Sequence, residues 1–92
     1  MTMKTIKATI TGRVTGVGFR YSAWLEARHR PGLHGWVRNR DARTVEALVQ
    51  GPPSEVDEMV AWLRHGPPGA AVEECRTEEL AAEPHLDSFQ VK

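Results

Sequence analysis

The sequence predicts an α+β fold, an antiparallel sheet with two helices on one face, and three observations support this prediction. Apolar and polar residues alternate in several short stretches, as they do in half-buried strands. Two other stretches place apolar residues at helical spacing. The elements follow the order βαββαβ with a short fifth strand, and two helices packed on one face would bury the apolar side of each.

The first strand and the first helix flank a glycine-rich stretch. The strand is expected over residues 5–12 and the helix over residues 21–30, where the Pro31-Gly32 pair ends it. The residues expected to face the core from these two elements are Ile6, Ala8, Ile10, Ala23, Trp24 and Ala27.

The second and third strands are expected over residues 33–39 and 44–50. Trp36 and Val37 provide the bulk of the second strand. The connection, residues 40–43, lacks the Asp-Gly pair of a tight hairpin, so we expect a looser loop of about four or five residues. In the third strand, Val45, Ala47 and Val49 should face inward, and Glu46, Leu48 and Gln50 should face outward.

The second half of the chain supplies the second helix and the last two strands. Ser54 is a suitable N-cap with Asp57 at the capping-box position, and glycines and prolines at 66–69 end the helix. Its apolar residues at helical spacing are Val56, Met59, Val60 and Leu63, with Trp62 beside them. Residues 72–80 form a weaker strand whose glutamates are typical of a protected edge, and residues 89–91 form the short last strand.

Length and composition indicate one small globular protein. The 92 residues are enough for one core, and we expect a single domain over residues 1–92. No apolar stretch approaches the ~20 residues of a membrane span, and no signal peptide precedes the first strand. Cys75 is the only cysteine, which excludes a disulfide framework and fits a reducing compartment. We expect a cytoplasmic monomer without a membrane partner.

The stretch Gly12–Arg20 contains three glycines and leads from a strand into a helix. Successive N–H groups in such a turn form a concave nest, and the helix N-terminus adds unpaired donors. Arg20 adds a charged fork that suits a phosphate or carboxylate. The stretch indicates a phosphoryl cradle; the alternative is a glycine-rich connection with an exposed arginine. No Gly-Lys-Ser/Thr ending follows, and Tyr21 replaces a third fingerprint glycine, so Walker and dinucleotide loops are excluded.

The formal net charge is zero, but the charges are unevenly distributed. Residues 1–43 carry nine Lys and Arg against two Asp and Glu, whereas residues 44–92 carry three against ten. The positive half contains the glycine stretch and would attract a small anion. Complementary packing of the two halves is the alternative explanation. A chain that is neutral overall does not indicate a nucleic-acid partner.

The remaining reactive and aromatic residues do not indicate a second site. The four histidines are scattered without ligand spacing, so no metal site is expected. Cys75 has no identifiable partner that would activate it as a nucleophile. Trp24, Trp36 and Trp62 are expected in the core and not as ligand platforms.

Two motifs lie at a fixed spacing, Gly-Arg-Val-Thr-Gly-Val-Gly-Phe-Arg at 12–20 and Gly-Leu-His-Gly-Trp-Val-Arg-Asn at 32–39. With Val45-Glu46, Gly51, Gly66-Pro67-Pro68 and Phe89, they resemble the acylphosphatase family over nearly the whole chain. This resemblance implies a ferredoxin-like sandwich, which is the fold that the order of the elements predicts.

The resemblance also implies a reaction, the metal-independent hydrolysis of a small acyl phosphate to a carboxylate and inorganic phosphate, without a cofactor. The catalytic residues of the family fall on Arg20 and Asn39. The phosphate-binding residues fall on Thr15, Gly16, Val17, Gly18, Phe19 and Arg20. Two departures matter: Thr15 stands where Gln is common, and Asp41-Ala42-Arg43 stands where Asp-Gly is common. The altered turn follows Asn39 and could shift it.

These residues suit that chemistry. Phosphoryl transfer depends mainly on positioning and charge stabilisation, which the nest and Arg20 would supply. Asn39 is too weak a base to take a proton, but its amide can orient a water. A carboxylate leaves without a general acid because the pKa of its conjugate acid is only ~4. An acyl phosphate is therefore favoured over a monoester.

Two other functions stay open at this point. One is a non-catalytic module of the same fold that binds an anion or RNA; the absence of aromatic residues at the outward positions of the first and third strands disfavours RNA. The other is a domain specialised for carbamoyl phosphate within a larger maturation protein. The shortness of the chain favours a free-standing enzyme.

Overall fold

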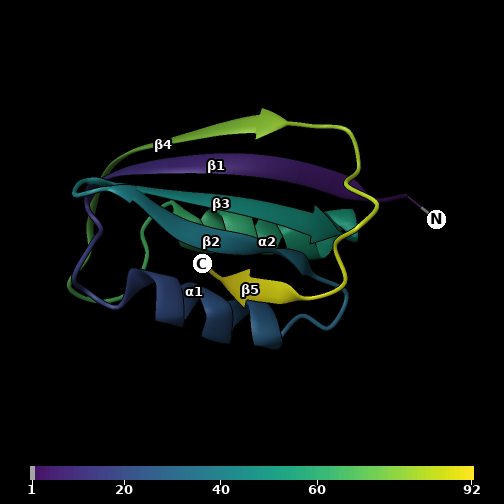
Figure 1. Ribbon diagram of the computed structural model, residues 1–92, viewed down its shortest axis with the longest axis horizontal. Coiled ribbons are helices and arrows are strands. Elements are labelled where there is room, and N and C mark those ends of the chain that lie inside the picture. The colour runs from purple at the N-terminus through teal and green to yellow at the C-terminus, as the bar shows by residue number, and fades with distance from the viewer. Residues whose placement is uncertain (1) are drawn as a thin grey trace.

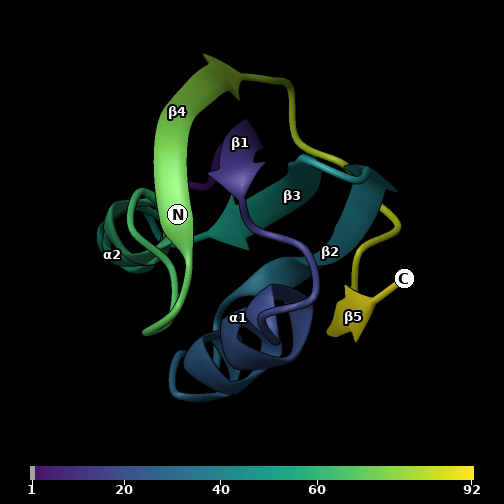
Figure 2. The same ribbon diagram turned by 90° about the vertical axis from the view of Figure 1, so that its left-hand side faces the viewer.

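A computed structural model describes residues 2–92 and shows a five-stranded sheet with both helices on the same side of it (Figures 1 and 2). The elements, in chain order, are β1 (Lys4–Arg13), α1 (Phe19–Arg28), β2 (His34–Asp41), β3 (Thr44–Gly51), α2 (Pro53–Leu63), β4 (Ala71–Glu79) and β5 (Phe89–Val91). This is the predicted α+β order.

The strands lie in the order β4-β1-β3-β2-β5, so β3 separates β1 from β2. The pairs β1–β3, β1–β4 and β2–β3 are antiparallel, as predicted. The short β5 runs parallel to β2, which makes the sheet mixed. This topology brings the β1–α1 loop and the β2–β3 turn to the same end of the sheet (Figure 1).

The core lies between the sheet and the two helices, and alternation in β1 and β3 builds one side of it. Predicted inward residues of both strands are buried, as are Ala23 and Ala27 of α1. The helix α2 buries Val56, Met59 and Leu63 against them. Burial of this apolar surface is the main force that holds the two layers together.

The opposite face of β3 is also buried, which corrects the expectation that Glu46, Leu48 and Gln50 face solvent. Three cationic side chains cover the Glu46 carboxylate, namely Lys7, Arg38 and Arg40, at 3.5, 2.9 and 3.9 Å. The Gln50 side chain is covered by the segment after β4: its Oε1 accepts the Glu83 N–H at 2.7 Å, and its Nε2 donates to the Glu83 carbonyl at 3.0 Å. Period-2 alternation identifies the two faces of a strand but not what covers them.

The predicted start of α2 and both predicted ends of α1 differ from the structure. The helix α2 begins at Pro53 with Pro52 as N-cap, and no side chain caps it, so the predicted Ser54 cap with its capping box is wrong. Proline suits the first helical turn because its missing N–H is not needed there. The helix α1 begins at Phe19 and ends at Arg28, two residues earlier at each end than predicted.

The connection between β2 and β3 is also tighter than the looser loop that was expected. Asp41 pairs with Thr44 directly across the turn, and the strand register shifts between Asn39 and Asp41. The N–H of Arg43 donates to the Asp41 carboxylate at 2.9 Å, which closes the turn locally. The turn is therefore formed without a glycine and without a residue of positive φ.

The tryptophans are only partly in the core. Trp62 packs against the buried ring of Phe19, with ring centroids 5.5 Å apart. The expectation of a core position is wrong for Trp24 and Trp36, which are half-buried. Each of them lies under a guanidinium, as the cation–π contact of Arg28 with Trp24 illustrates at 4.7 Å.

Candidate active site

The loop between β1 and α1 makes a concave backbone surface, and two of its glycines shape it. Gly16 and Gly18 have φ angles of 72° and 75°, in the left-handed region that glycine enters without strain. Gly18 is the N-cap of α1, and its carbonyl accepts the Ser22 N–H at 2.9 Å. No side chain caps this helix, and its first turn holds no carboxylate, so its first N–H groups can bind an anion.

Gly12 has a different role from the one expected in the cradle. A Cβ on this residue would overlap the main-chain oxygen of Ala71 in β4. The β1–β4 register also shifts between Thr11 and Gly12. Gly12 therefore allows two strands to approach closely, and it does not line the cavity beside the loop.

That cavity has a volume of about 250 Å³ and lies at the N-terminus of α1. Its lining residues come from the glycine loop, α1, β2 and β5, and they are Val14, Gly16, Gly18, Phe19, Arg20, Tyr21, Asn39 and Val91. The volume is several times the ~30 Å³ that one water molecule occupies in the liquid. The cavity therefore has room for a small ligand of several non-hydrogen atoms.

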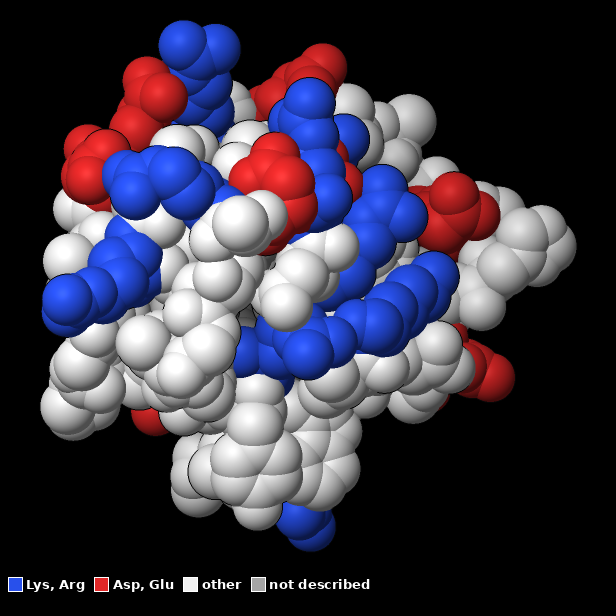
Figure 3. All heavy atoms as spheres, turned by 60° about the vertical axis from the view of Figure 1, so that its left-hand side comes forward, with Lys and Arg blue, Asp and Glu red and all other residues white. Residues whose placement is uncertain are grey.

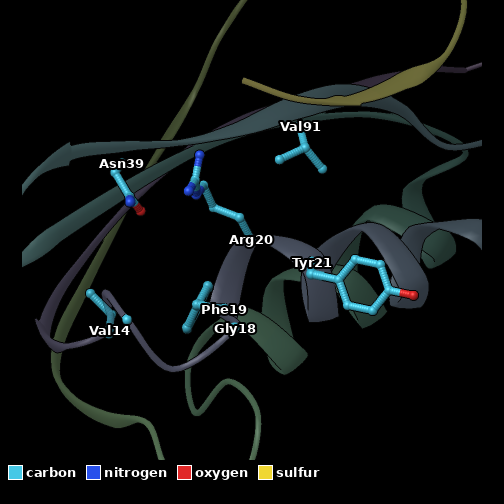
Figure 4. Close-up of a pocket in the computed structure, with 8 residues that line it drawn as sticks. Val14, Gly18, Phe19, Arg20, Tyr21, Asn39 and Val91 are labelled. Atoms are coloured by element: carbon cyan, nitrogen blue, oxygen red, sulfur yellow. The ribbon is translucent and has the colours of Figure 1, made fainter.

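Arg20 and Asn39 extend into this cavity from different elements. Figure 4 shows the guanidinium of Arg20 and the amide of Asn39 directed toward one another across the cavity. Arg20 lies in the first turn of α1, where its Nη1 donates to the main-chain oxygen of Lys92 at 2.8 Å. Asn39 lies near the end of β2. The tertiary fold thus joins two residues that are 19 positions apart.

The β2–β3 turn is fastened to the glycine loop by two hydrogen bonds. The Thr15 hydroxyl donates to the Ala42 carbonyl at 2.6 Å, and the Gly12 N–H donates to the Arg43 carbonyl at 2.9 Å. The hydrogen bond from the Arg43 main chain lowers the pKa of the Asp41 carboxyl, so the bond that closes the turn persists to a lower pH than it would with an ordinary aspartate. These hydrogen bonds hold the turn that follows Asn39 next to the glycine loop.

The predicted phosphate-binding residues do not all line the cavity. Gly16, Gly18, Phe19 and Arg20 do, whereas Thr15 and Val17 do not. The Phe19 side chain is buried in the core, so only the main chain of this residue is available to a ligand. Thr15 directs its hydroxyl to Ala42.

Sequence reasoning did not find Tyr21 and Val91 among the lining residues. Tyr21 follows Arg20, and its exposed helical position was an available signal. Val91 had no signal of its own, because its position depends on the parallel pairing of β5 with β2.

The uneven distribution of charge along the chain was open to two explanations, attraction of a small anion and complementary packing of the two halves. Figure 3 shows Lys and Arg side chains across the middle of the face, with Asp and Glu around them. Several ion pairs join the two halves of the chain, including Lys4 to Asp57 at 2.7 Å and Arg43 to Glu73 at 2.7 Å. Complementary packing of the two halves therefore accounts for part of the uneven charge distribution.

Two further properties concern residues 2–92, the part of the chain that the structure describes. Within that part of the chain, no three His, Cys, Asp or Glu side chains form a group able to hold a metal ion. None of its helices is both long and apolar enough to cross a membrane.

Comparison with known proteins decides the family. The family model for acylphosphatase matches residues 6–91. The chain belongs to the acylphosphatase family. The predicted resemblance and the predicted fold are both confirmed.

Individual acylphosphatases agree with this assignment. An acylphosphatase of Burkholderia cenocepacia is 47% identical over 88 residues, which cover 96% of this chain and 89% of the relative. The solved acylphosphatase of Coxiella burnetii has a TM-score of 0.89 and 34% identity, and 98% of this chain and 93% of that chain are covered. The acylphosphatase of Bacillus subtilis has a TM-score of 0.89 and 33% identity, with 99% of both chains covered. This chain is accordingly an acylphosphatase-family enzyme that acts on acyl phosphates.

Proposed function

We propose that this acylphosphatase binds the phosphoryl group of its substrate with Arg20 and the main chain of residues 15–20, and that Asn39 orients the attacking water. The observation that supports the proposal is the meeting of Arg20 and Asn39 in one cavity at the N-terminus of α1. A guanidinium and a set of unpaired N–H groups suit the charge of a phosphoryl group. The amide can position a water.

The cradle stabilises charge during the reaction. The N–H groups at the start of α1 and the fork of Arg20 hold the phosphoryl oxygens, so their negative charge is stabilised as the bond to the leaving group lengthens. The Nη1 of Arg20 donates to the main-chain oxygen of Lys92 at 2.8 Å, and this hydrogen bond helps to hold the guanidinium in the cavity before substrate arrives.

The Asn39 side chain sets the direction of attack. Its amide oxygen accepts a hydrogen bond from the water, whose oxygen forms the new bond to phosphorus. The bond between phosphorus and the carboxyl oxygen breaks, and its electron pair leaves on the carboxylate. The proton of the water passes to the phosphate product or to solvent. No general acid is needed, because a carboxylate is a stable leaving group near neutral pH.

We expect this enzyme to act as a monomer, since one chain supplies all the residues of the proposed site. We also expect a cytoplasmic location, because the single cysteine, Cys75, fits a reducing compartment. Binding of an anion without hydrolysis, or binding of RNA, is the alternative that the assay below separates.

The test is release of inorganic phosphate from acetyl phosphate and benzoyl phosphate in the presence of EDTA, with para-nitrophenyl phosphate as the monoester control. Both acyl phosphates should be hydrolysed and the monoester should not. In water enriched in heavy oxygen, the label should enter phosphate and not the carboxylate, because attack is at phosphorus. Binding of phosphate without hydrolysis would contradict the proposal, and so would label in the carboxylate.

A further inference from the structure

The carboxylate of Glu46 lies on the face of β3 that points away from the core, and its side chain is only 7% exposed. Its Oε1 accepts a hydrogen bond from Nε of Arg38 at 3.0 Å and lies 2.9 Å from Nη2 of the same guanidinium. Its Oε2 lies 3.5 Å from Nζ of Lys7 and 3.9 Å from Nη1 of Arg40. One buried carboxylate of β3 thus joins cations from β1 and β2.

The two arginines that contact this carboxylate are the neighbours of Asn39 in β2. Successive side chains of a strand point to opposite faces of the sheet, so the residue between two that reach Glu46 points to the other side. Figure 4 shows the amide of Asn39 directed toward Arg20 in the cavity. The carboxylate therefore holds β2 immediately before and immediately after Asn39.

Main-chain pairing between β2 and β3 is irregular at this place. Asn39 and Asp41 pair with consecutive residues of β3, so Arg40 between them has no partner in the ladder. A bulge of this kind disrupts the ladder locally and changes the direction of nearby side chains. The contacts of Glu46 on both sides of Asn39 therefore restrain β2 at the point where main-chain pairing is interrupted.

We infer that Glu46 is a positioning residue for the hydrolysis of acyl phosphates, because its contacts with Arg38 and Arg40 keep β2 in the geometry that directs Asn39 toward the substrate. The inference rests on the proposed function, in which Asn39 orients the water. Glu46 does not line the cavity and acts from the other face of the sheet. Loss of its contacts should therefore slow turnover and leave ground-state binding of phosphate intact.

The first test compares kcat, KM and inhibition by inorganic phosphate in Glu46→Gln and Arg38→Met, at a temperature at which every variant is folded. Each substitution removes one charge of the ion pair and keeps a side chain of similar length. We expect kcat for benzoyl phosphate to fall about 3- to 10-fold, with phosphate inhibition close to the wild-type value. The double variant should be about as slow as the slower single variant, because both substitutions break the same contact.

Two control variants lie on the same face of the sheet, since directly paired residues of neighbouring strands share a face. Gln50→Ala removes another buried polar side chain of β3, which lies opposite His34 at the start of β2. Arg76→Met removes an exposed guanidinium of β4. Gln50→Ala should lower the melting temperature, and both variants should keep the wild-type kcat. An equal fall of kcat in Gln50→Ala and Glu46→Gln would overturn the positioning role, because loss of stability alone would then slow the enzyme.

The second test observes Asn39 without reference to activity. Asn39 is the only asparagine in the chain, so asparagine labelled with heavy nitrogen gives a single side-chain amide to follow by NMR. Relative to the wild type, this signal should broaden or split in Glu46→Gln and in Arg38→Met, because β2 then samples more than one arrangement. In Gln50→Ala it should keep the wild-type line width.

The possible failures are distinguishable. If the wild-type enzyme hydrolyses neither acetyl phosphate nor benzoyl phosphate, the proposed function fails. If it is active, Asn39→Ala is inactive, and Glu46→Gln keeps the wild-type kcat and amide signal, the proposed function stands and the positioning role is wrong. A double variant slowed by the product of the two single effects would also overturn that role, because Glu46 and Arg38 would then act independently.

Discussion

The hydroxyl of Thr15 donates a hydrogen bond to the main-chain oxygen of Ala42 at 2.6 Å. Thr15 and Asp41-Ala42-Arg43 are the two departures noted with the sequence resemblance to the family, and the fold brings them into contact. The bond ties the glycine loop to the turn that follows Asn39. The two departures therefore form one local unit, in which the threonine supports the altered turn.

Removing this hydrogen bond should loosen the position of Asn39. Thr15→Val keeps the shape and the main-chain N–H but leaves the Ala42 carbonyl unpaired. We expect kcat to fall about 3- to 10-fold, because small displacements of a positioning group are costly, while inhibition by phosphate changes little. Steady-state kinetics would measure this. Thr15→Ser restores the hydroxyl and serves as the control, and equal losses in both variants would contradict the role of the bond.

Arg20 should be required for both binding and turnover. Arg20→Ala removes the charged fork from the cavity, and we expect kcat/KM to fall at least about 100-fold, as for loss of a main transition-state donor. Arg20→Lys should recover little, since an ammonium lacks the planar fork. Arg28→Ala, which removes the same charge from the same helix outside the cavity, is the control. Phosphate inhibition close to wild type in Arg20→Ala would exclude this residue from the site.

Asn39 should affect turnover without affecting ground-state binding. If its amide orients water, Asn39→Ala should reduce kcat about 100-fold or more while phosphate still inhibits at a near-normal concentration. Asn39→Asp places a negative charge beside the phosphoryl group, so it should weaken phosphate binding and not create a better base. If Asn39 only supports the hairpin, both variants would instead melt at lower temperature with normal turnover of the folded enzyme.

The role of Gly18 in anion binding can be tested by comparing Gly18→Ala with the same substitution at Gly69. Gly18 and Gly69 both have positive φ angles, 75° and 95°, and a Cβ on either would meet no atom within 4 Å. Alanine at either position should therefore cost a similar free energy of unfolding, about 1 kcal/mol, from backbone strain alone. Only Gly18→Ala should weaken phosphate inhibition, because Gly18 lines the cavity. Equal inhibition constants in the two variants would mean that Gly18 serves the turn alone.

The buried carboxylate of Glu46 should make stability depend on pH. Burial raises the pKa of Glu46, but the hydrogen bond with Arg38 and the charges of Lys7 and Arg38 outweigh it, so the pKa is lowered overall. A carboxyl with a lower pKa in the folded state stabilises the protein above its unfolded-state pKa, and this contribution is lost as the pH falls through the folded-state pKa. Stability should therefore decrease below about pH 4.

Glu46→Gln isolates this contribution. The variant should lose about 1–2 kcal/mol of unfolding free energy at neutral pH, the range for hydrogen bonds to charged groups with partly exposed partners. Its stability should also decrease less steeply in acid than that of the wild type. Urea unfolding at pH 7 and pH 3.5 would measure both. Parallel pH profiles for the two proteins would exclude Glu46 as the titrating group.

The sequence by itself determined the order of the elements and the glycine loop between β1 and α1. Several predictive patterns are local properties of the chain, so they can be recognised without knowledge of tertiary contacts. They are the alternation in β1 and β3, the helical spacing in α2, and the glycine and proline clusters between elements. The same holds for two glycines of the β1–α1 loop, because the left-handed backbone at Gly16 and Gly18 favours glycine whatever surrounds it.

The tertiary structure decided which residues that are distant in the sequence come into contact. The strand order places the β2–β3 turn, and Asn39 with it, beside the β1–α1 loop, and the parallel addition of β5 brings Val91 to the same cavity. The covering of Glu46 by cations from β1 and β2, and the contact of Thr15 with Ala42, join residues far apart in the sequence. Such contacts depend on how the layers pack, and no local preference of the chain encodes them.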